Sequence, residues 1–208
     1  MLTLMEDFST PLRYARNDKI MKRLFLAIPI QTVNNGFAPL IDDLRKRLSH
    51  EKLINWVRPT NIHLTLKFIG ETPPQDEPRI IEAVSKVLEN QQSFTMDFNR
   101  TGIFGARYAP RVLWLGMQQT PQELLNLEEA VLTAFDGIGY QRDRQNFVPH
   151  LTLGRIKDLC EKQYFQKVVQ AIEQKTYIHQ EVKEVILFQS ILRPDGAVYK
   201  IVKKWNLI

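Results

Sequence analysis

The sequence predicts an α+β fold in which one unit of strands and helices is used twice. Strand and helix patterns alternate along the 208 residues, which favours a mixed fold. Two expected hairpins indicate that the sheets are largely antiparallel. The tetrapeptide HLTL occurs at residues 63–66 and again at residues 150–153, once in each half of the chain. The duplication is inferred from element order, because the halves share little residue identity beyond this motif.

The first half is expected to run strand, helix, strand, helix and strand. Residues 23–28 form a short apolar run that stops at Pro29, as a buried strand does. A first amphipathic helix has its apolar face at Phe37, Leu40, Ile41, Leu44 and Leu48. An extended piece at residues 56–58 precedes the first HLTL strand, which continues to Gly70. A second helix has its apolar face at Ile80, Ile81, Val84, Val87 and Leu88.

The second half repeats this order between two expected hairpins. Residues 94–98 and 111–115 are predicted to pair across a long connection that contains Gly102 and Gly105. The third helix is predicted to start at a capping box formed by Thr120 and Glu123 and to end at Gly137. The second HLTL strand and a fourth helix follow, the helix with apolar residues Phe165, Val168, Val169 and Ile172. Strands at residues 182–192 and 197–202 close the chain around a turn at residues 194–196.

Composition and charge limit the classes of protein. Hydrophobic residues make up 44% and charged residues 25%, as in globular proteins. The net charge of +5 suits a polyanionic partner. A single cysteine, Cys160, excludes an internal disulfide and fits a reducing compartment. The longest apolar run, residues 24–28, is too short to span a bilayer, and the N-terminus has no secretory signal pattern. We expect a cytoplasmic protein that does not contact membranes.

The two HLTL motifs are the candidate functional sites. In a strand, successive side chains point to opposite faces, so His63 and Thr65 share one face while the leucines enter the core. His150 and Thr152 do the same in the second copy. Two copies of this tetrapeptide, with the same leucines in both, are rarely expected by chance. An imidazole and a hydroxyl would therefore lie side by side on the open face of each strand.

This combination of side chains suits proton transfer on an anionic substrate. Histidine exchanges protons near neutral pH, so two of them on opposite sides of a substrate can act as base and acid. Threonine hydroxyls donate hydrogen bonds to anionic oxygens. Arg155 would clamp a phosphate if a bulge at Gly154 turned it to the histidine side. No zinc-binding spacing and no phosphate-binding loop is present, and His50 and His179 are expected to be exposed.

These stretches resemble the two-histidine (2H) phosphoesterase superfamily, and within it the RNA 2′,3′-cyclic phosphodiesterases, also called 2′-5′ RNA ligases. The resemblance covers residues 21–208 and rests on residues 23–29, 56–70, 111–116, 147–155 and 190–199. It implies a single bilobal domain over residues 21–208, with pseudo-twofold symmetry and a positively lined cleft between its lobes. Residues 1–20 fall outside it and are expected to be a loosely attached extension.

The resemblance also implies an activity. A member of this family hydrolyses a 2′,3′-cyclic phosphate on RNA to a 2′-phosphate without a metal or cofactor, and can join RNA ends through a 2′-5′ bond. RNA ends, tRNA fragments among them, are the expected partners, with no obligate protein partner. In that scheme His63 protonates the departing 3′-oxygen and His150 activates water, while Thr65, Thr152 and Arg155 hold the phosphate oxygens. The near-symmetry of the two motifs leaves the division between acid and base open.

Three aromatic residues are candidates for stacking a base at the cleft: Phe25, Trp114 and Tyr199. Core packing is the competing interpretation, and it is favoured for Phe25 and Trp114. Two rival functions are a module that binds RNA ends without turnover and a phosphodiesterase of a small cyclic nucleotide. The enzyme is favoured over the binding module, because a pure binder can use lysine or arginine and has no need of two imidazoles.

Overall fold

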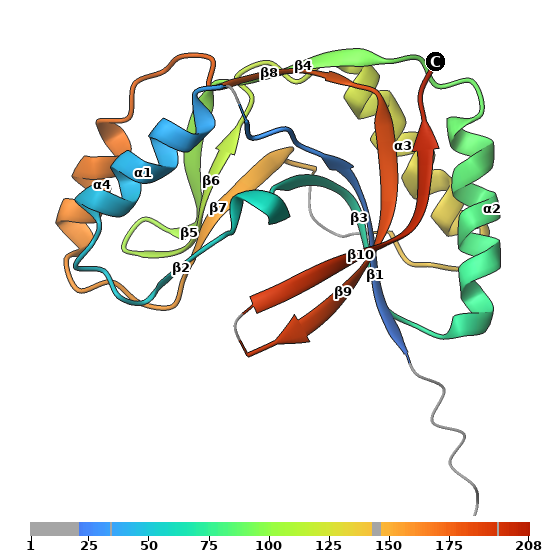
Figure 1. Cartoon of the computed structure of the whole chain (residues 1–208), viewed down its shortest axis with the longest axis horizontal. Coiled ribbons are helices and arrows are strands. Elements are labelled where there is room, and N and C mark those ends of the chain that lie inside the picture. Colours follow the sequence, from blue (N-terminus) through green and yellow to red (C-terminus); the bar gives the residue numbers. More distant parts are fainter. Residues whose placement is uncertain (1–20, 34, 143–146, 195) are drawn as a thin grey trace, which may run out of the picture.

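The computed structural model describes residues 21–33, 35–142, 147–194 and 196–208. The expected extension at residues 1–20 lies outside the described residues, so its loose attachment stays a prediction. The described chain forms two lobes, each built on a four-stranded sheet with two helices beside it (Figure 1). Every strand pairing is antiparallel among the described residues. The predicted α+β class with mainly antiparallel sheets is confirmed.

The first sheet has the strand order β10-β9-β1-β3. Its strands are β1 (Lys22–Pro29), β3 (His63–Thr72), β9 (Glu184–Arg193) and β10 (Gly196–Asn206). Two helices pack against each other on the side of this sheet that faces away from the other lobe, α2 (Glu77–Leu88) and α3 (Gln122–Gly137) (Figure 1).

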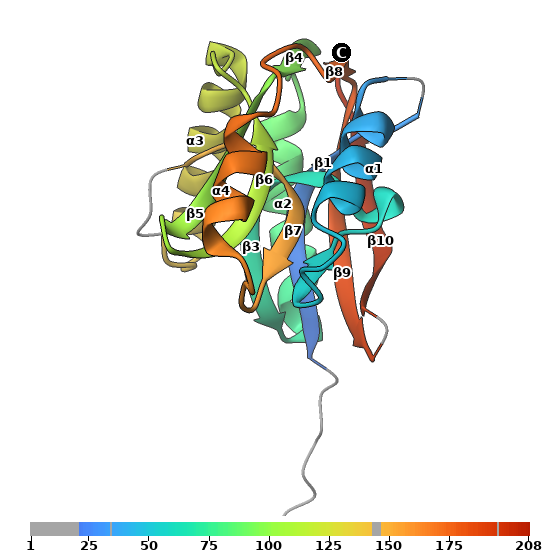
Figure 2. The ribbon, with the colours of Figure 1, turned by 90° about the vertical axis from the view of Figure 1, so that its left-hand side faces the viewer.

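The second sheet has the strand order β2-β7-β6-β5. Its strands are β2 (Ile54–Trp56), β5 (Arg100–Ala106), β6 (Ala109–Gly116) and β7 (His150–Ile156). Two helices lie beside it, α1 (Phe37–Arg47) and α4 (Lys162–Gln170), as both views show (Figures 1 and 2). A ribbon of β4 (Phe94–Phe98) and β8 (Ile178–Val182) bridges the two lobes. Short 3-10 turns precede β3 and α2, η1 (Pro59–Asn61) and η2 (Pro74–Asp76).

The two halves of the chain exchange elements between the lobes. With β2, β10 and the 3-10 turns set aside, the halves run β1-α1-β3-α2-β4-β5 and β6-α3-β7-α4-β8-β9. The pair β1–β3 takes β9 from the second half as its neighbour, and the pair β6–β7 takes β5 from the first half. Helix α3 likewise packs against β3. The predicted duplication of element order is therefore present, but each lobe combines strands and helices from both halves.

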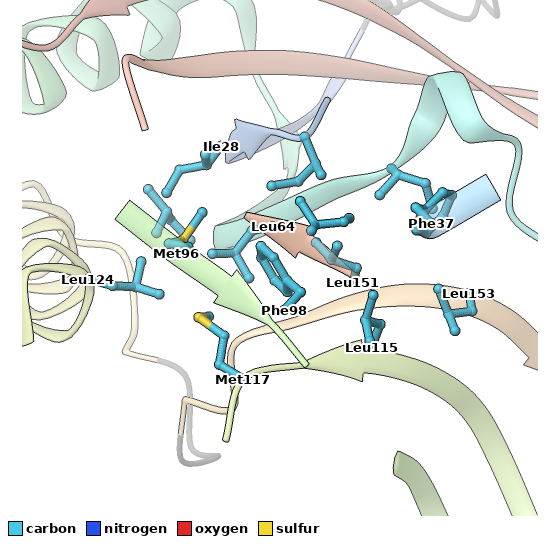
Figure 3. Close-up of a cluster of buried hydrophobic side chains, with 14 of the residues drawn as sticks. Ile28, Phe37, Leu64, Met96, Phe98, Leu115, Met117, Leu124, Leu151 and Leu153 are labelled. Atoms are coloured by element: carbon cyan, nitrogen blue, oxygen red, sulfur yellow. The ribbon is translucent and has the colours of Figure 1, made fainter. Parts of the chain in front are cut away.

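The leucines of both motif strands are buried in one hydrophobic core, as their alternation predicts. Leu64 and Leu66 are 1% and 3% exposed, and Leu151 and Leu153 are fully buried. Figure 3 shows Leu64 and Leu151 beside Phe98 of the bridging ribbon. Because the leucines anchor both strands from the core side, the histidine and threonine faces are left toward the space between the lobes.

Two expectations about local structure are wrong. Residues 100–106, expected as a loop, form β5 and pair with β6. β4 pairs with the unexpected strand β8 instead of with β6. Gly102 suggests a loop in the sequence, but it occupies a strand position where the indole of Trp114 crosses the backbone. A Cβ there would lie 2.2 Å from a Trp114 ring carbon, so only glycine fits.

The prediction of a capping box at the start of α3 is also wrong. The helix begins at Gln122 with Pro121 as its N-cap, and no side chain makes a capping hydrogen bond. Pro121 has extended backbone angles and offers no side-chain acceptor. Thr120 thus lies one residue too early, and Glu123 does not reach the third helical position that a capping box requires.

Candidate active site

The open faces of β3 and β7 line a single cleft of about 510 Å³. Its walls include His63 and Thr65 from β3 and His150 and Thr152 from β7. The two strands belong to different sheets and different lobes. The structure therefore brings together the four motif side chains that the sequence analysis selected.

Both histidines are anchored in the same way. Nδ1 of His63 lies 2.7 Å from the carbonyl oxygen of Asn61, and Nδ1 of His150 lies 2.7 Å from that of Val148. A carbonyl oxygen only accepts hydrogen bonds, so Nδ1 is the protonated nitrogen of each ring. In the neutral imidazole, Nε2 is then the nitrogen that can accept a proton. The two motifs thus present the same tautomer to the cleft.

Burial lowers the pKa of both histidines below the ordinary value of 6.5. The hydrogen bonds to Asn61 and Val148 oppose this effect, and the positive charge of Arg155 adds to it. His150 lowers the pKa of His63 further. At pH 7 the neutral imidazole is therefore the main form of each ring.

A bulge in β7 turns Arg155 into the same cleft. Leu113 of β6 pairs with Gly154 and Trp114 pairs with Thr152, so Leu153 has no partner on β6. The extra residue reverses the alternation of faces, and Arg155 lines the cleft with the histidines. In a regular strand it would point to the opposite side. The bulge suggested by Gly154 is therefore present, and its unpaired residue is Leu153.

Aromatic rings support His63 from two sides. The centroid of its ring lies 4.8 Å from that of Phe25 and 5.2 Å from that of Tyr199. Phe25 is only 3% exposed, so its ring packs beneath His63 and offers a base little area. Tyr199 is half-buried and lines the cleft. Burial raises the pKa of Tyr199, which Arg155 and Arg23 oppose, so the phenol stays protonated at neutral pH.

A matching pair of rings supports His150. Its centroid lies 4.7 Å from that of Phe104 and 6.4 Å from that of Trp114. Trp114 is 8% exposed and does not line the cleft, which agrees with the packing interpretation. Gly102 and Gly116 lie against its indole, where a Cβ would approach to 2.2 and 2.9 Å. The indole thus lies near His150, and both glycines are needed to admit it.

Several residues of the cleft were missed from the sequence. Asn61 positions His63 through its carbonyl, and its Nδ2 donates to the Ala197 carbonyl at 2.8 Å. The other missed residues on the cleft wall include Arg23, Phe68, Phe104 and Ser190. Arg23 carried a usable signal, since it lies two residues before Phe25 on the same strand. Phe68 carried another, since it follows His63 by the same interval as Arg155 follows His150.

No carboxylate lines the cleft among the residues that the structure describes. Over the same residues, no group of three or more His, Cys, Asp or Glu side chains is arranged to hold a metal ion. The described donor set is made of imidazoles, hydroxyls, guanidinium groups and an amide. Such a set fits proton transfer on a bound anion.

Two further histidines lie outside this cleft. His179 pairs with Asp97 across the bridging ribbon at 2.7 Å, and His50 lies 3.5 Å from the carboxylate of Glu51. Neither lines the cleft. None of the helices that the structure describes is both long enough and apolar enough to cross a membrane.

Comparison with known proteins identifies the family. A model of the 2′-5′ RNA ligase superfamily matches residues 34–191. The chain belongs to this superfamily. An RNA 2′,3′-cyclic phosphodiesterase of Archaeoglobus fulgidus is 33% identical over 178 residues, which is 86% of this chain and 96% of the relative. One from Thermotoga maritima is 31% identical over 180 residues, 86% of this chain and 92% of the relative.

Solved structures agree with this assignment. E. coli LigT complexed with 3′-AMP matches with a TM-score of 0.65 and 25% identity, over 90% of this chain and 98% of that chain. The protein TT0787 of Thermus thermophilus matches with a TM-score of 0.69 and 22% identity, over 89% of this chain and 97% of that chain. The second match supports the fold alone. The family expected from the motif contexts is confirmed.

Proposed function

We propose that this protein hydrolyses the 2′,3′-cyclic phosphate at the end of an RNA chain and leaves a 2′-phosphate. The observation that carries this proposal is the single cleft in which two HLTL faces present two identically anchored imidazoles. Relatives named RNA 2′,3′-cyclic phosphodiesterase align over most of the chain. The net charge of +5 suits a polyanionic RNA.

The two imidazoles divide the proton transfers of the reaction. Nε2 of His150 takes a proton from water as the water oxygen bonds to phosphorus. The bond between phosphorus and the 3′-oxygen breaks, and the protonated Nε2 of His63 gives its proton to that oxygen. The products are a 2′-phosphate and a 3′-hydroxyl. One proton enters the site and one leaves it, so exchange with solvent restores both rings.

The remaining polar groups hold the phosphate. Arg155, Thr65 and Thr152 donate hydrogen bonds to its non-bridging oxygens. The bound anion also offsets the charge of Arg155 and so favours the imidazolium form of His63 that the acid step requires. Tyr199 lies against the edge of His63 and contributes to substrate binding beside it.

The same chemistry joins RNA ends when a 5′-hydroxyl replaces water. His150 then removes the proton of the hydroxyl, and the product carries a 2′-5′ bond. Free RNA ends in the cytoplasm, tRNA fragments among them, are the substrates that we propose. This location rests on the single cysteine of the chain, and the choice of substrate rests on its basic charge.

The test uses an oligonucleotide that ends in a 2′,3′-cyclic phosphate, incubated with the protein in excess EDTA. We expect the gain of one water by mass spectrometry and a 2′-phosphate signal by ³¹P NMR. Loss of turnover in EDTA would contradict a metal-independent reaction. Binding without turnover would favour the binding module instead. Turnover of free cyclic mononucleotides alone would favour a small-molecule phosphodiesterase.

A further inference from the structure

Four cations and an exposed aromatic ring gather on the second lobe, outside the cleft. A small pocket of about 80 Å³ is lined by Tyr108 and Arg111 of the β5–β6 hairpin, by Lys157 directly after β7 and by Lys162 at the start of α4. The guanidinium carbon of Arg107 lies 5.7 Å from the centroid of the Tyr108 ring. These five residues form a basic surface.

The charges of the basic surface are not neutralised by neighbouring carboxylates. None of its four cations has a carboxylate partner at ion-pair distance among the described residues. Asp158 also lines the pocket, but its Oδ1 accepts a hydrogen bond from the N–H of Leu159 at 2.9 Å. On the first lobe, by contrast, Lys86 and Arg142 contact carboxylates at 2.7 to 2.9 Å. Exposed charges without such partners attract a polyanion.

The basic surface begins where the wall of the cleft ends. Val112 of β6 and Arg155 of β7 are paired, and both line the cleft. Arg111 directly precedes Val112, and Lys157 follows Arg155 by two residues. Nη1 of Arg111 donates to the carbonyl oxygen of Lys157 at 3.3 Å, which joins the two segments beyond this pair. An RNA chain that leaves the cleft past Arg155 therefore meets the basic surface next.

The hairpin that carries Tyr108 is held against α4. Gly105 has a φ of +100°, and a Cβ there would lie 2.7 Å from the carbonyl oxygen of Ala109, so the turn requires glycine. Nε2 of Gln166 on α4 donates to the carbonyl oxygen of Arg107 at 2.6 Å (Figure 2). Tyr108 is nevertheless 60% exposed. An exposed ring among cations is the arrangement that stacks the bases of single-stranded nucleic acid.

We propose that the basic surface binds the RNA chain on the 5′ side of the cyclic end. Arg111, Lys157 and Lys162 contact its phosphates, and Tyr108 stacks one of its bases. This proposal rests on the proposed function and extends the substrate beyond the nucleotide that reacts. Contacts to phosphates carry no sequence information, and a ring stacks any base, so we expect little dependence on RNA sequence.

The kinetic test compares two substrates that end in the same cyclic phosphate. One is a dinucleotide, and the other has about twelve nucleotides, enough to span a single-strand binding site. The double variant Arg111→Gln/Lys157→Gln should lose about tenfold in kcat/KM on the long substrate, mainly through KM, because two phosphate contacts are removed. It should match the unmodified protein on the dinucleotide. An equal loss on both substrates, or no loss on the long one, would overturn the proposal.

Two lysines of β10 supply a matched control. Lys200 and Lys203 are exposed and line neither the cleft nor the small pocket. Within the part of the chain that the structure describes, neither has a carboxylate partner. Lys200→Gln/Lys203→Gln removes the same charge and should leave kcat/KM unchanged on both substrates. A loss on the long substrate equal to that of Arg111→Gln/Lys157→Gln would overturn the proposal, because net charge alone would explain it.

Binding at several salt concentrations separates the phosphate contacts from the stacking. The probe is a fluorescent oligonucleotide that ends in a 2′-phosphate, and anisotropy gives its Kd. In Arg111→Gln/Lys157→Gln the slope of log Kd against log salt should fall by about 1.4, or about 0.7 for each phosphate contact. Tyr108→Ala should weaken binding about fivefold or more without changing the slope, and Tyr108→Phe should keep the affinity. An unchanged slope in the double variant would overturn the phosphate contacts, and unchanged affinity in Tyr108→Ala would overturn the stacking.

These binding measurements require no turnover, so they also separate this proposal from the proposed function. A protein that shows the expected binding losses but hydrolyses no cyclic phosphate would refute the function and keep the basic surface. A protein that hydrolyses both substrates at rates that Arg111→Gln/Lys157→Gln does not change would refute the basic surface alone.

Discussion

The motif strands β3 and β7 are alike where the chemistry requires it and different one bulge later. Each offers a histidine whose Nδ1 is held 2.7 Å from the carbonyl oxygen two residues earlier. Each buries its leucines and bulges at the second one. Beyond the bulge, β7 presents Arg155 and β3 presents Phe68. The two strands thus present the same histidine and threonine to the cleft, and they differ in the fifth residue after the histidine, a cation on β7 and an aromatic ring on β3.

The two strands also differ in what holds them. β3 is the edge strand of its sheet, whereas β7 lies between β6 and β2. The N–H of Val57, directly after β2, donates to the carbonyl of the bulged residue Leu153 at 2.9 Å. Asn55 pairs with Arg155, and the close approach of Ile54 leaves little space beside Gly154. The strand that carries Arg155 is therefore supported on both sides, which suits the phosphate contact that we propose for this residue.

The largest expected effect tests the likeness of the two histidines. Because we propose that each transfers a proton in the transition state, His63→Ala and His150→Ala should each lower kcat by about a hundredfold or more. A substrate with sulfur in place of the bridging 3′-oxygen separates their roles, since a thiolate leaves without protonation. The sulfur substrate should restore turnover to His63→Ala and not to His150→Ala, as measured in single-turnover assays.

His179→Ala is the control for this experiment, because its ring lies in the bridging ribbon and away from the cleft. It should keep full activity on both substrates. If the sulfur substrate restored turnover to His150→Ala and not to His63→Ala, the proposed acid and base roles would be reversed. If both variants turned over substrate as fast as the unmodified protein, the histidines would have no role in the mechanism.

Much of this site follows from local sequence, because faces of a strand repeat every two residues. That period places His63 with Thr65 and His150 with Thr152 without knowledge of the fold. The pairing of β4 with β8 and the exchange of strands between lobes depend on contacts far apart in the chain, which no local pattern encodes. Gly102 shows the difference, since a glycine in a strand and a glycine in a loop look the same until Trp114 is in place.

The orientation of Arg155 and Phe68 depends on bulges that the sequence marks unevenly. Gly154 follows the unpaired residue of β7 and signals a possible bulge, whereas Lys67 at the matching position of β3 gives no such signal. The period of two therefore predicts the wrong face for both residues. Arg155 is still a candidate from the sequence because a cation suits a phosphate, whereas Phe68 is marked only by its interval from His63.

The next largest effect tests the charge that distinguishes β7 from β3. Removing Arg155 takes away a charged hydrogen bond to the phosphate, worth about 1.5–3 kcal/mol, so Arg155→Gln should lower kcat/KM about tenfold to a hundredfold. Arg155 lowers the pKa of both histidines, so its loss raises both. The state with one neutral imidazole and one imidazolium then persists to higher pH. The pH at which kcat/KM is highest should therefore rise.

Two further variants isolate the charge. Arg155→Lys keeps the positive charge and loses the fork of donors, so its maximum should stay near that of the unmodified protein while kcat/KM falls. Arg23→Gln should also leave the maximum in place, because Arg23 is not among the groups that shift either histidine. If the pH of highest kcat/KM did not change in Arg155→Gln, the charge of Arg155 would not act on the two imidazoles.

The smallest effect tests whether the two hydroxyls are equivalent. Thr65→Val and Thr152→Val keep the shape of the side chain and remove one hydrogen bond to the phosphate, worth about 0.5–1.5 kcal/mol. Each should lower kcat/KM by about twofold to tenfold, and the double variant should lose roughly the product of the two. Urea unfolding of each variant checks that stability is unchanged. A loss at only one threonine would mean that one motif alone holds the phosphate, and that the likeness of β3 and β7 at this position is structural.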